Sequence, residues 1–464
     1  MLLTTSFWFL PVLPAALAVS VDYETLKADK GDKLPDFSLC GYHSSNDPLP
    51  SPNREVADVL SPTNGDQSQR IQDALDTISS SGGGVLELKS GEYQLFKGIV
   101  IPTKTSLRGV GQGRTVVLPK DGSFTAFTMG TAVTGPEPES SVDITDDYVP
   151  VGALEVTVKS ASGLKAGQAV WIQRAVTQEW IDANGMATLP EPGDHWLTPY
   201  DTVFQPRTIT AVSSNTVTLD VPLTDQLDHD YMSPKLATYT APAEASTEMG
   251  LESLSITLSP TCSGKILNDT SYARSLAITG FNNGVKIAQN ASRLTIQDVN
   301  ITRDHDMDNG AGYAADIGIS GTQVLVVDSS TRGGEGAKSF PVVTQSLAPG
   351  SNAVVRHFAQ QANMQIQPHA HWAHGLLVDN TTATTTLINR GSAGSGHGWA
   401  INSGVAWNVV GDYDVQSPPL GTNWGVGCRG GARGDDNNGT MVAEGQAVEP
   451  VSLFEAQLAA RGRV

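Results

Sequence analysis

The side chains that could do acid–base chemistry gather in one part of this sequence. Of its nine histidines, six lie between positions 305 and 397, among arginine and lysine residues. Histidine and lysine move protons once their pKa is tuned, and arginine neutralises carboxylates. The chain has 29 Lys+Arg against 48 Asp+Glu, a net charge of −19, so a local basic cluster favours an anionic ligand. Its members are Arg303, His305, Lys338, Arg356, His357, His369, His371, His374, Arg390 and His397.

These groups match the needs of β-elimination on a uronate-containing polysaccharide. A base must remove the proton at C5, a cation must neutralise the adjacent carboxylate, and an acid must protonate the leaving oxygen. We therefore predict a polysaccharide lyase with an acidic polymer as its partner. The expected catalytic groups are Lys338 or His371 as base, Arg303 and Arg356 as carboxylate neutralisers, and His305 and His397 as acid or positioning groups.

Further basic and aromatic side chains in the same segments provide a surface for the polymer. The segments 367–374 and 389–399 each combine histidine with tryptophan. The expected substrate-binding residues are His369, Trp372, His374, Arg390 and Trp399.

Other functions remain open. Inverting glycoside hydrolysis needs two carboxyls about 6–9 Å apart, and the sequence shows no such pair in this region. A glycoside hydrolase and a non-catalytic carbohydrate-binding or cell-wall protein are the alternatives to the lyase. An isomerase or epimerase acting on the same C5 proton is a third.

The same segments contain two incomplete metal-binding patterns. Asp304, Asp306 and Asp308 resemble the start of a calcium loop, but the glycine comes one place late and no glutamate closes the loop. The histidines of 369–374 have a spacing that can ligate a transition metal, but no carboxylate partner is evident. We predict no metal ligands, and calcium stays open as a cofactor.

The elements that must position these residues are short strands separated by turns. From about residue 245 apolar strands recur roughly every ten residues with Gly, Asn and Ser between them, which suits the coils of a β-helix. Before them, residues 66–78 place apolar residues at helical spacing, and Ser81 and three glycines end that helix. We predict an all-β fold, a right-handed parallel β-helix (solenoid) with an N-terminal cap helix.

A different pattern interrupts the coils between residues 135 and 235. Alternating strands such as Leu154–Val158 and Thr216–Val221 are separated by turns, which predicts an inserted antiparallel β subdomain. Its aromatic residues have two interpretations: they form the core of the subdomain, or a wall of rings on which sugars stack. They are Trp171, Trp180, Trp196 and Tyr200.

Several motifs resemble known β-helix proteins. The Gly-Gly-Gly-Val, Gly-x-Tyr and Leu-Arg-Gly-x-Gly elements of residues 82–111 resemble the first coils of the pectate-lyase-like superfamily. Residues 338–461 contain segments similar to a group of secreted fungal and bacterial β-helix proteins without an assigned activity. Glu335, Lys338 and Arg356 stand in the order that β-helix alginate and dermatan lyases use, although the spacing differs. Gly396-His397-Gly398 resembles an element of inverting galacturonanases, but an Asp-Asp pair is found only downstream, at 435–436.

The N-terminus predicts export from the cell. Residues 1–18 are apolar and end in Ala16-Leu17-Ala18, which is typical of a signal-peptidase site.

Three cysteines, Cys40, Cys262 and Cys428, allow one disulfide at most. The acidic balance argues against a nucleic-acid partner, no membrane contact is expected after cleavage, and the oligomeric state stays open. The expected glycosylation sites of this secreted, extracellular glycoprotein are Asn268, Asn290, Asn300, Asn380 and Asn438.

The chain is thus divided into six parts. The predicted segments are a signal peptide (1–18), an extended leader (19–60), first coils with the cap helix (61–134), the inserted subdomain (135–235), the main β-helix with the active groove (236–430), and a C-terminal loop and cap helix (431–464).

Overall fold

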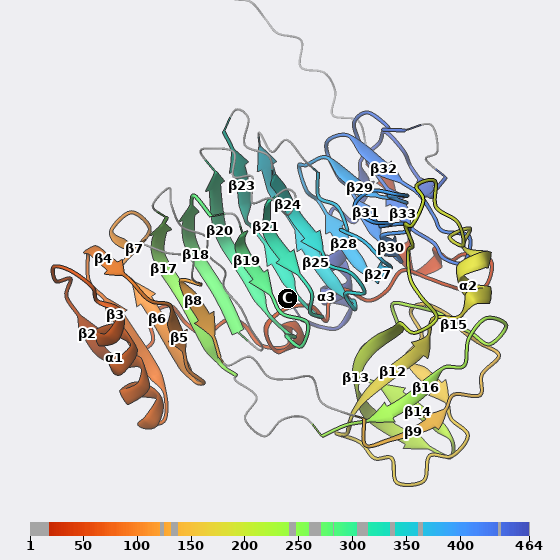
Figure 1. The fold of residues 1–464 in the computed structure, drawn as a ribbon, viewed down its shortest axis with the longest axis horizontal. Coiled ribbons are helices and arrows are strands. Elements are labelled where there is room, and N and C mark those ends of the chain that lie inside the picture. The colour runs from red at the N-terminus through yellow and green to blue at the C-terminus, as the bar shows by residue number, and fades with distance from the viewer. Residues whose placement is uncertain are drawn as a thin grey trace, which may run out of the picture.

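Most of the chain forms a stack of coils with parallel strands, and an antiparallel subdomain lies beside the later coils (Figure 1). The all-β parallel β-helix with an inserted subdomain is therefore confirmed. The computed structural model describes residues 18–120, 125–130, 138–240, 247–258, 271–281, 283–303, 314–334, 339–360, 365–434 and 438–463.

One long parallel sheet runs along the solenoid, and each strand pairs with a strand of the next coil. Leu107, Leu251, Ala273 and Ile296 lie in register on successive coils and belong to the interior core. Burial of one large apolar side chain contributes about 1.5–3 kcal/mol, so this ladder of residues holds the coils together. The strands in spatial order are β2 (Val56–Leu60), β3 (Gly84–Leu88), β6 (Thr105–Gly109), β17 (Met249–Thr257), β18 (Ser271–Thr279), β20 (Thr295–Arg303), β22 (Leu325–Val327), β25 (Asn352–Val355), β28 (Leu376–Asp379), β31 (Val405–Trp407), β33 (Trp424–Val426) and β34 (Thr440–Val442).

Shorter parallel strands form the other sides of the coils. Some extend the long sheet: β4 (Gly91–Leu95), β7 (Thr115–Pro119), β23 (Ser330–Gly333) and β26 (Phe358–Gln360). Others form separate sheets: β5 (Ile99–Ile101) with β8 (Phe127–Met129), β19 (Asn283–Ile287) with β21 (Ala314–Ile319) and β24 (Ser339–Thr344), β27 (Ala373–His374) with β30 (Ile401–Asn402), and β29 (Thr385–Leu387) with β32 (Tyr413–Val415).

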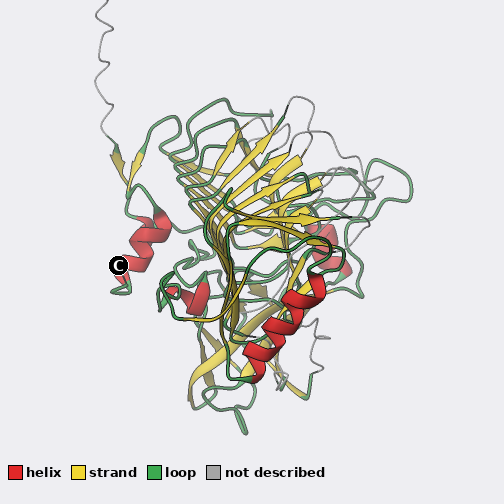
Figure 2. Cartoon of the chain, turned by 90° about the vertical axis from the view of Figure 1, so that its left-hand side faces the viewer, coloured by secondary structure: helices red, strands yellow, loops and turns green. Residues whose placement is uncertain are grey.

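Helix α1 (Ser68–Ser80) covers the first end of the stack (Figure 2). Its apolar residues Ile71, Leu75 and Ile78 are buried because they recur at helical spacing and contact the first coils. The chain then turns at Gly83, where φ is +100° and a β-carbon would lie 2.4 Å from the carbonyl oxygen of Lys104. Only glycine tolerates both conditions, so this turn fixes how the helix joins β3.

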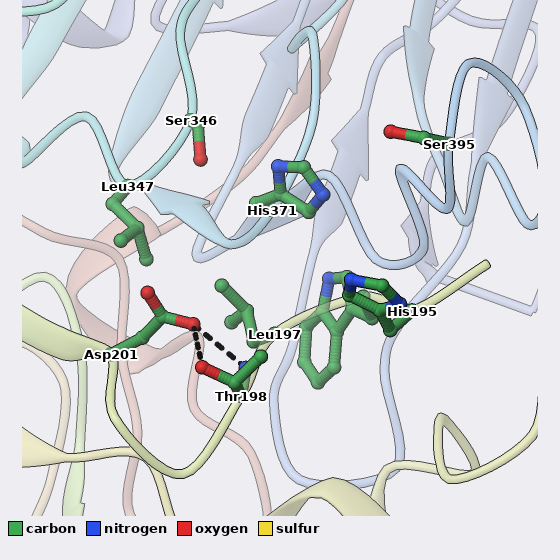
Figure 3. Close-up of a pocket in the computed structure, with 9 residues that line it drawn as sticks. His195, Leu197, Thr198, Asp201, Ser346, Leu347, His371 and Ser395 are labelled. Atoms are coloured by element: carbon green, nitrogen blue, oxygen red, sulfur yellow. Dashed lines mark hydrogen bonds between the residues drawn. The ribbon is translucent and has the colours of Figure 1, made fainter. Parts of the chain in front are cut away.

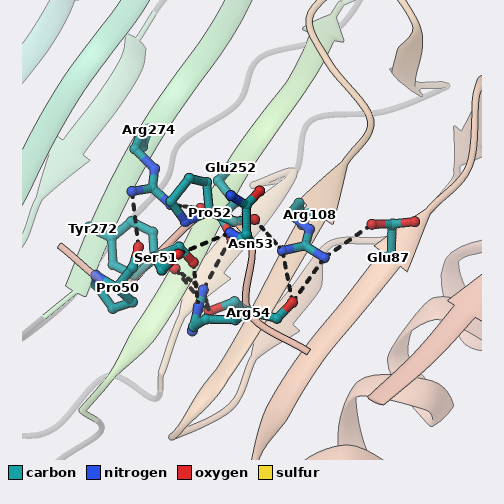
Figure 4. Close-up of polar contacts among 11 residues, drawn as sticks. Pro50, Ser51, Pro52, Asn53, Arg54, Glu87, Arg108, Glu252, Tyr272 and Arg274 are labelled. Atoms are coloured by element: carbon teal, nitrogen blue, oxygen red, sulfur yellow. Dashed lines mark hydrogen bonds and ion pairs between the residues drawn. The ribbon is translucent and has the colours of Figure 1, made fainter. Parts of the chain in front are cut away.

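The polar leader lies across the outer face of the long sheet. It contains β1 (Val19–Ser20) and two 3-10 turns, Tyr23–Thr25 and Tyr42–Ser45. Further along it, the Nη2 atom of Arg54 lies 3.1 Å from Oε1 of Glu252, and Arg274 binds the other carboxylate oxygen (Figure 4). The Glu252 side chain is fully buried, so two guanidinium groups compensate one carboxylate under the leader.

The C-terminal segment covers the outer face of the later coils. Helix α3 (Leu453–Ala460) begins at Ser452, whose hydroxyl accepts a hydrogen bond from the Glu455 N–H. The buried carboxylate of Asp379, on β28, accepts hydrogen bonds from the Ser452 hydroxyl and from the Phe454 N–H. The strand β35 (Val448–Glu449) pairs with β1, so the leader and the C-terminal segment are joined at this face.

The inserted subdomain is a sheet of antiparallel strands with a core of its own. Strand alternation places Val170 and Ile172 in that core, while Trp171 lies on the opposite face. Its elements are β9 (Ser140–Asp143), β10 (Tyr148–Val149), β11 (Glu155–Thr157), β12 (Ala169–Ala175), α2 (Gln178–Ala183), β13 (Thr202–Ser213), β14 (Thr216–Leu219), β15 (Leu227–Asp228) and β16 (Lys235–Thr238).

Cys40 and Cys428 are both buried as free thiols, and Cys262 lies outside the described residues. Among the helices that the structure describes, none is long and apolar enough to cross a membrane. The expected glycosylation residues differ in exposure: Asn290 and Asn438 are exposed, Asn300 and Asn380 are partly buried, and Asn268 is not described.

Candidate functional site

The subdomain docks on the later coils through a buried polar contact centred on Asp225. The Asp225 carboxylate is fully buried and pairs with Arg174 of β12 at 2.6 Å. It also accepts hydrogen bonds from Trp372 Nε1 at 2.7 Å and from Asn402 Nδ2 at 3.1 Å, both on the coils. Trp372 and Asn402 are held in place by the coil stack, so the contact fixes where the subdomain lies relative to the β-helix.

Tryptophan rings surround this contact and form a shared core. The Trp180 and Trp196 rings of the subdomain stack with centroids 4.9 Å apart, and the Trp372 ring meets both of them edge-on. Trp372 is fully buried and Trp399 is 7% exposed, with its Nε1 donating to the Asn184 carbonyl. Contrary to the sequence-based expectation, Trp372 and Trp399 therefore join the two parts of the chain and offer no face to a polymer.

A pocket of about 300 Å³ opens beside this core, between the subdomain and the coils (Figure 3). The subdomain contributes residues of the 195–201 segment, and the coils contribute His371 together with the turns at 346–347 and 395. Figure 3 shows His371 above Asp201 and Leu197, with Ser346 and Ser395 on either side. The lining residues are His195, Trp196, Leu197, Thr198, Asp201, Ser346, Leu347, His371 and Ser395.

The backbone at His371 turns sharply to place the ring in this pocket. His371 and Trp372 both have positive φ, +51° and +54°, which is uncommon for residues other than glycine. The Leu347 N–H donates to the His371 carbonyl at 2.9 Å, and the His371 N–H donates to the His397 carbonyl at 3.0 Å. These bonds hold a strained turn that directs one side chain to the pocket and the next to the buried interface.

The hydrogen bond of the His371 ring defines its protonation state. Its Nε2 lies 3.1 Å from the carbonyl oxygen of Gly396, which can only accept, so Nε2 carries the proton. Burial lowers the pKa of His371, so the ring is neutral at pH 7. The lone pair of Nδ1 is then available as a base, and in Figure 3 this side of the ring faces Ser346.

Asp201 is the carboxylate of the pocket and tunes this histidine. Its Oδ2 accepts hydrogen bonds from the Thr198 N–H at 2.7 Å and the Thr198 hydroxyl at 3.0 Å. The negative charge of Asp201 raises the pKa of His371, which offsets part of the lowering by burial. The pocket therefore combines a neutral base with a fixed negative charge.

His369, His397 and Arg390 form a group behind His371. The His397 ring lies 4.6 Å from the His369 ring and 6.0 Å from the His371 ring, measured between centroids. Arg390 donates to the His369 carbonyl. Burial, with the nearby Arg390 charge, lowers the pKa of His369 and lowers that of His397 to about 4. The structure thus brings these predicted residues together, but as neutral imidazoles with one guanidinium rather than as a cationic patch.

A second pocket of about 470 Å³ adjoins the first and shares Asp201 and Leu347 with it. One wall is the outward face of β12 and β13, where Trp171 lies opposite Pro206 in the register. The other wall is a pair of turns of the coils. The lining residues are Trp171, Tyr200, Asp201, Thr202, Phe204, Pro206, Gln289, Asn290, Leu347 and Pro349.

The remaining predicted groups lie elsewhere. Arg303 has a side chain that is 1% exposed and pairs with buried Asp316 at 2.5 Å, so its charge is already compensated. Arg356 binds Asp328 at 2.6 Å and reaches Glu455 of α3, on the face covered by the C-terminal helix.

Of the remaining residues of the predicted basic cluster, two histidines are buried and two residues lie outside the described residues. His357 and His374 are fully buried, and burial lowers the pKa of each to about 4. Nδ1 of His374 lies 2.7 Å from the Thr224 hydroxyl oxygen and forms a hydrogen bond with it. This bond lies within the docking interface rather than on a polymer-binding surface. His305 and Lys338 lie outside the described residues, as do the three aspartates of the calcium pattern. The described residues contain no cluster of three or more His, Cys, Asp or Glu that could hold a metal ion.

Most of the pocket could not be predicted from the sequence. His195, Thr198 and Asp201 come from the subdomain, some 170 residues before His371, and no local pattern links them to it. Ser346 and Ser395 lie in turns whose composition is ordinary for loops. One feature of the sequence pointed to the subdomain side of the pockets: the concentration of aromatic residues around 171–204.

Comparisons with known proteins give only distant similarity. No protein-family model matches the chain, and no curated protein matches it. Among solved structures, it is similar to the tailspike protein of E. coli bacteriophage HK620 in complex with pentasaccharide, at 10% identity and a TM-score of 0.40 over 92% of this chain and 68% of that one. It is also similar to the tailspike protein gp49 of Pseudomonas phage LKA1, at 13% identity and a TM-score of 0.30 over 80% and 70% of the two chains.

A third similar structure is the A-module of the mannuronan C-5 epimerase AlgE4 from Azotobacter vinelandii, at 10% identity and a TM-score of 0.26 over 84% of this chain and 95% of that one. These similarities are too distant to assign an activity. The chain is a parallel β-helix protein, and its membership of the pectate-lyase-like superfamily stays a prediction.

Proposed function

We propose that the protein is secreted and acts on a polysaccharide bound between the inserted subdomain and the coils, where His371 is the base of a β-elimination at a uronate. One observation carries the proposal: the Nε2–H of His371 is held by the Gly396 carbonyl, and Nδ1 is left as an acceptor in a pocket. A base for the C5 proton needs this protonation state at neutral pH.

The proposed reaction follows from the pocket. Nδ1 of His371 takes the C5 proton, the C–H electrons form the C4–C5 double bond, and the C4–O bond breaks. The leaving oxygen takes a proton from exposed His195, the other histidine of this pocket. Asp201 increases the basicity of His371 by its charge, and Thr198 holds Asp201 in position. Arg303 and Arg356 take no part in this scheme, because their guanidinium groups are engaged elsewhere.

A second candidate is a non-catalytic carbohydrate-binding protein. Within the described lining of this pocket there is no lysine or arginine to neutralise a uronate carboxylate, and this observation favours binding without turnover. A hydrolase has less support, because the same lining offers the single carboxylate of Asp201 where inversion needs two.

The test compares turnover with binding in matched variants. Purified protein is incubated with pectate, alginate, glucuronan and glycosaminoglycans, and unsaturated product is followed by its ultraviolet absorbance. His371→Ala should reduce turnover about 10²–10⁴-fold, the usual contribution of a general base, while binding of the polymer persists. His229→Ala is the control, because that exposed histidine also bonds a carbonyl, Ile144 O at 2.9 Å, away from the pocket.

Three results would contradict the lyase proposal. Reducing ends without unsaturated product indicate a hydrolase, and binding without turnover by the parent indicates a carbohydrate-binding protein. Equal turnover by His371→Ala and His229→Ala would remove His371 from the mechanism.

A further inference from the structure

The pocket next to the His371 site has a different chemical character. Its subdomain wall consists of rings: Trp171 lies 5.3 Å from Phe204 and 4.7 Å from Tyr239, measured between ring centroids. Trp171, Phe204 and Pro206 share one face of the sheet, because alternate strand residues point to the same side. Tyr200, at the edge of this wall, is 95% exposed.

The exposure of Tyr200 separates it from the other aromatic residues of the subdomain. Trp180 and Trp196, from the same region, are 0% and 3% exposed and belong to the docking core. Among the large apolar and aromatic side chains that the structure describes as exposed, the others expose less than half of their surface. A ring left this open beside a pocket of rings is the arrangement by which proteins bind ligands with one apolar face.

The opposite wall supplies polar groups without charge. The amide side chain of Gln289 is exposed at the turn that follows β19, and the neighbouring Asn290 amide is exposed in the chain without a glycan. Amides can donate to and accept from hydroxyl groups, whereas the only charged residue of the described lining is Asp201, at the border with the His371 pocket. A neutral sugar would therefore meet rings on one face and uncharged amides at its edge.

We propose that this aromatic pocket is a subsite for a neutral or N-acetylated hexose, adjacent to the subsite where the uronate reacts. The substrate class is then a heteropolymer that joins uronates to neutral sugars, rather than a homopolymer such as pectate or alginate. This inference rests on the proposed function for the position of the uronate. The continuity of the two pockets through Asp201 and Leu347 places the two sugars in one chain.

The binding test uses neutral oligosaccharides, which cannot undergo elimination. Cello-oligosaccharides and chito-oligosaccharides are titrated into the full chain produced in bacteria, where Asn290 carries no glycan, and tryptophan fluorescence reports on Trp171. Tyr200→Ala should weaken binding at least about tenfold, because a ring contact of this kind contributes on the order of the 1.4 kcal/mol that a factor of ten requires. Phe358→Ala, which removes a ring that is 44% exposed on the coils, is the control and should not change binding.

A turnover test separates this inference from the proposed function. Elimination is compared on homopolyuronates and on polymers that alternate uronate with N-acetylhexosamine, with the parent and with Tyr200→Ala. A preference for the alternating polymers that Tyr200→Ala abolishes supports the inference. Binding of the neutral oligosaccharide without elimination of any polymer would leave the subsite in place and overturn the lyase function.

Two results would overturn the subsite. One is an absence of binding by both types of neutral oligosaccharide. The other is elimination of the alternating polymers at the same rate by the parent and by Tyr200→Ala, which would leave the lyase function standing without a neutral subsite.

Discussion

Replacing Asp225 by asparagine should release the subdomain from the coils. The carboxylate is completely buried and is bound by Arg174, Trp372 and Asn402. The substitution leaves the guanidinium of Arg174, whose side chain is 1% exposed, without its counter-charge. Breaking a buried ion pair by removing one partner costs about 3–5 kcal/mol, because the remaining charge stays desolvated.

Hydrogen exchange measures this effect at the interface itself. Amides of the docking segment 222–228 should exchange roughly 10²–10³-fold faster in Asp225→Asn, since 1.4 kcal/mol corresponds to a factor of ten. The control is Asp143→Asn, which removes a surface pair with Lys235 at 4.0 Å where both side chains are about half exposed. Such a pair contributes about 0–1 kcal/mol, so exchange in the control should change little.

A double variant and a pH series complete the experiment. Arg174→Gln added to Asp225→Asn removes the uncompensated charge and should restore part of the protection. Burial raises the pKa of Asp225, but Arg174 and the other neighbouring groups lower it by a larger amount. The pKa of Asp225 therefore lies below the ordinary value. The carboxylate therefore stabilises the interface above the unfolded pKa, and this contribution is lost as the pH falls. If Asp225→Asn exchanges no faster than Asp143→Asn, the buried pair does not hold the subdomain.

Two further predictions concern the pocket and the leader. Asp201→Asn removes a charge that raises the pKa of His371, so the acidic limb of the pH–rate profile should move to lower pH; an unchanged limb would show that His371 is not the titrating base. Glu252→Gln leaves Arg54 and Arg274 without their shared carboxylate, so limited proteolysis should cleave the leader near Arg54 faster than in the parent, whereas Glu155→Gln, at an exposed strand position of the subdomain, should leave the cleavage rate unchanged. Cleavage at equal rates in the Glu252 and Glu155 variants would contradict the role given to the buried carboxylate.

The fold was predictable because it depends on local patterns. The helical spacing of Ile71, Leu75 and Ile78, and short apolar strands about ten residues apart, are visible without knowledge of long-range contacts. The alternation of Thr216–Val221 likewise indicated an antiparallel sheet in the subdomain.

The site was predicted only in part because it joins distant segments. The histidines at 369, 371 and 397 were expected in one basic cluster, and the His397 ring lies 4.6 Å from that of His369 and 6.0 Å from that of His371, measured between centroids. Their neutral state depends on burial, which the sequence does not show, and Asp201 reaches them only after the subdomain docks. Arg303 and Arg356 were expected in the same group, but Asp316 and Asp328 bind them in other parts of the fold.

The docking contact at Asp225 also bears on the order in which the molecule forms. The described strand pairings of the subdomain all join residues between 140 and 238, and contacts that are closer in the chain form earlier than more distant ones. The partners of Asp225 follow it by 147 and 177 residues, so they exist only once the later coils have been made and stacked. The pocket between the subdomain and the coils therefore forms in a late folding step, and a chain that stops short of His371 would carry a folded subdomain without this pocket.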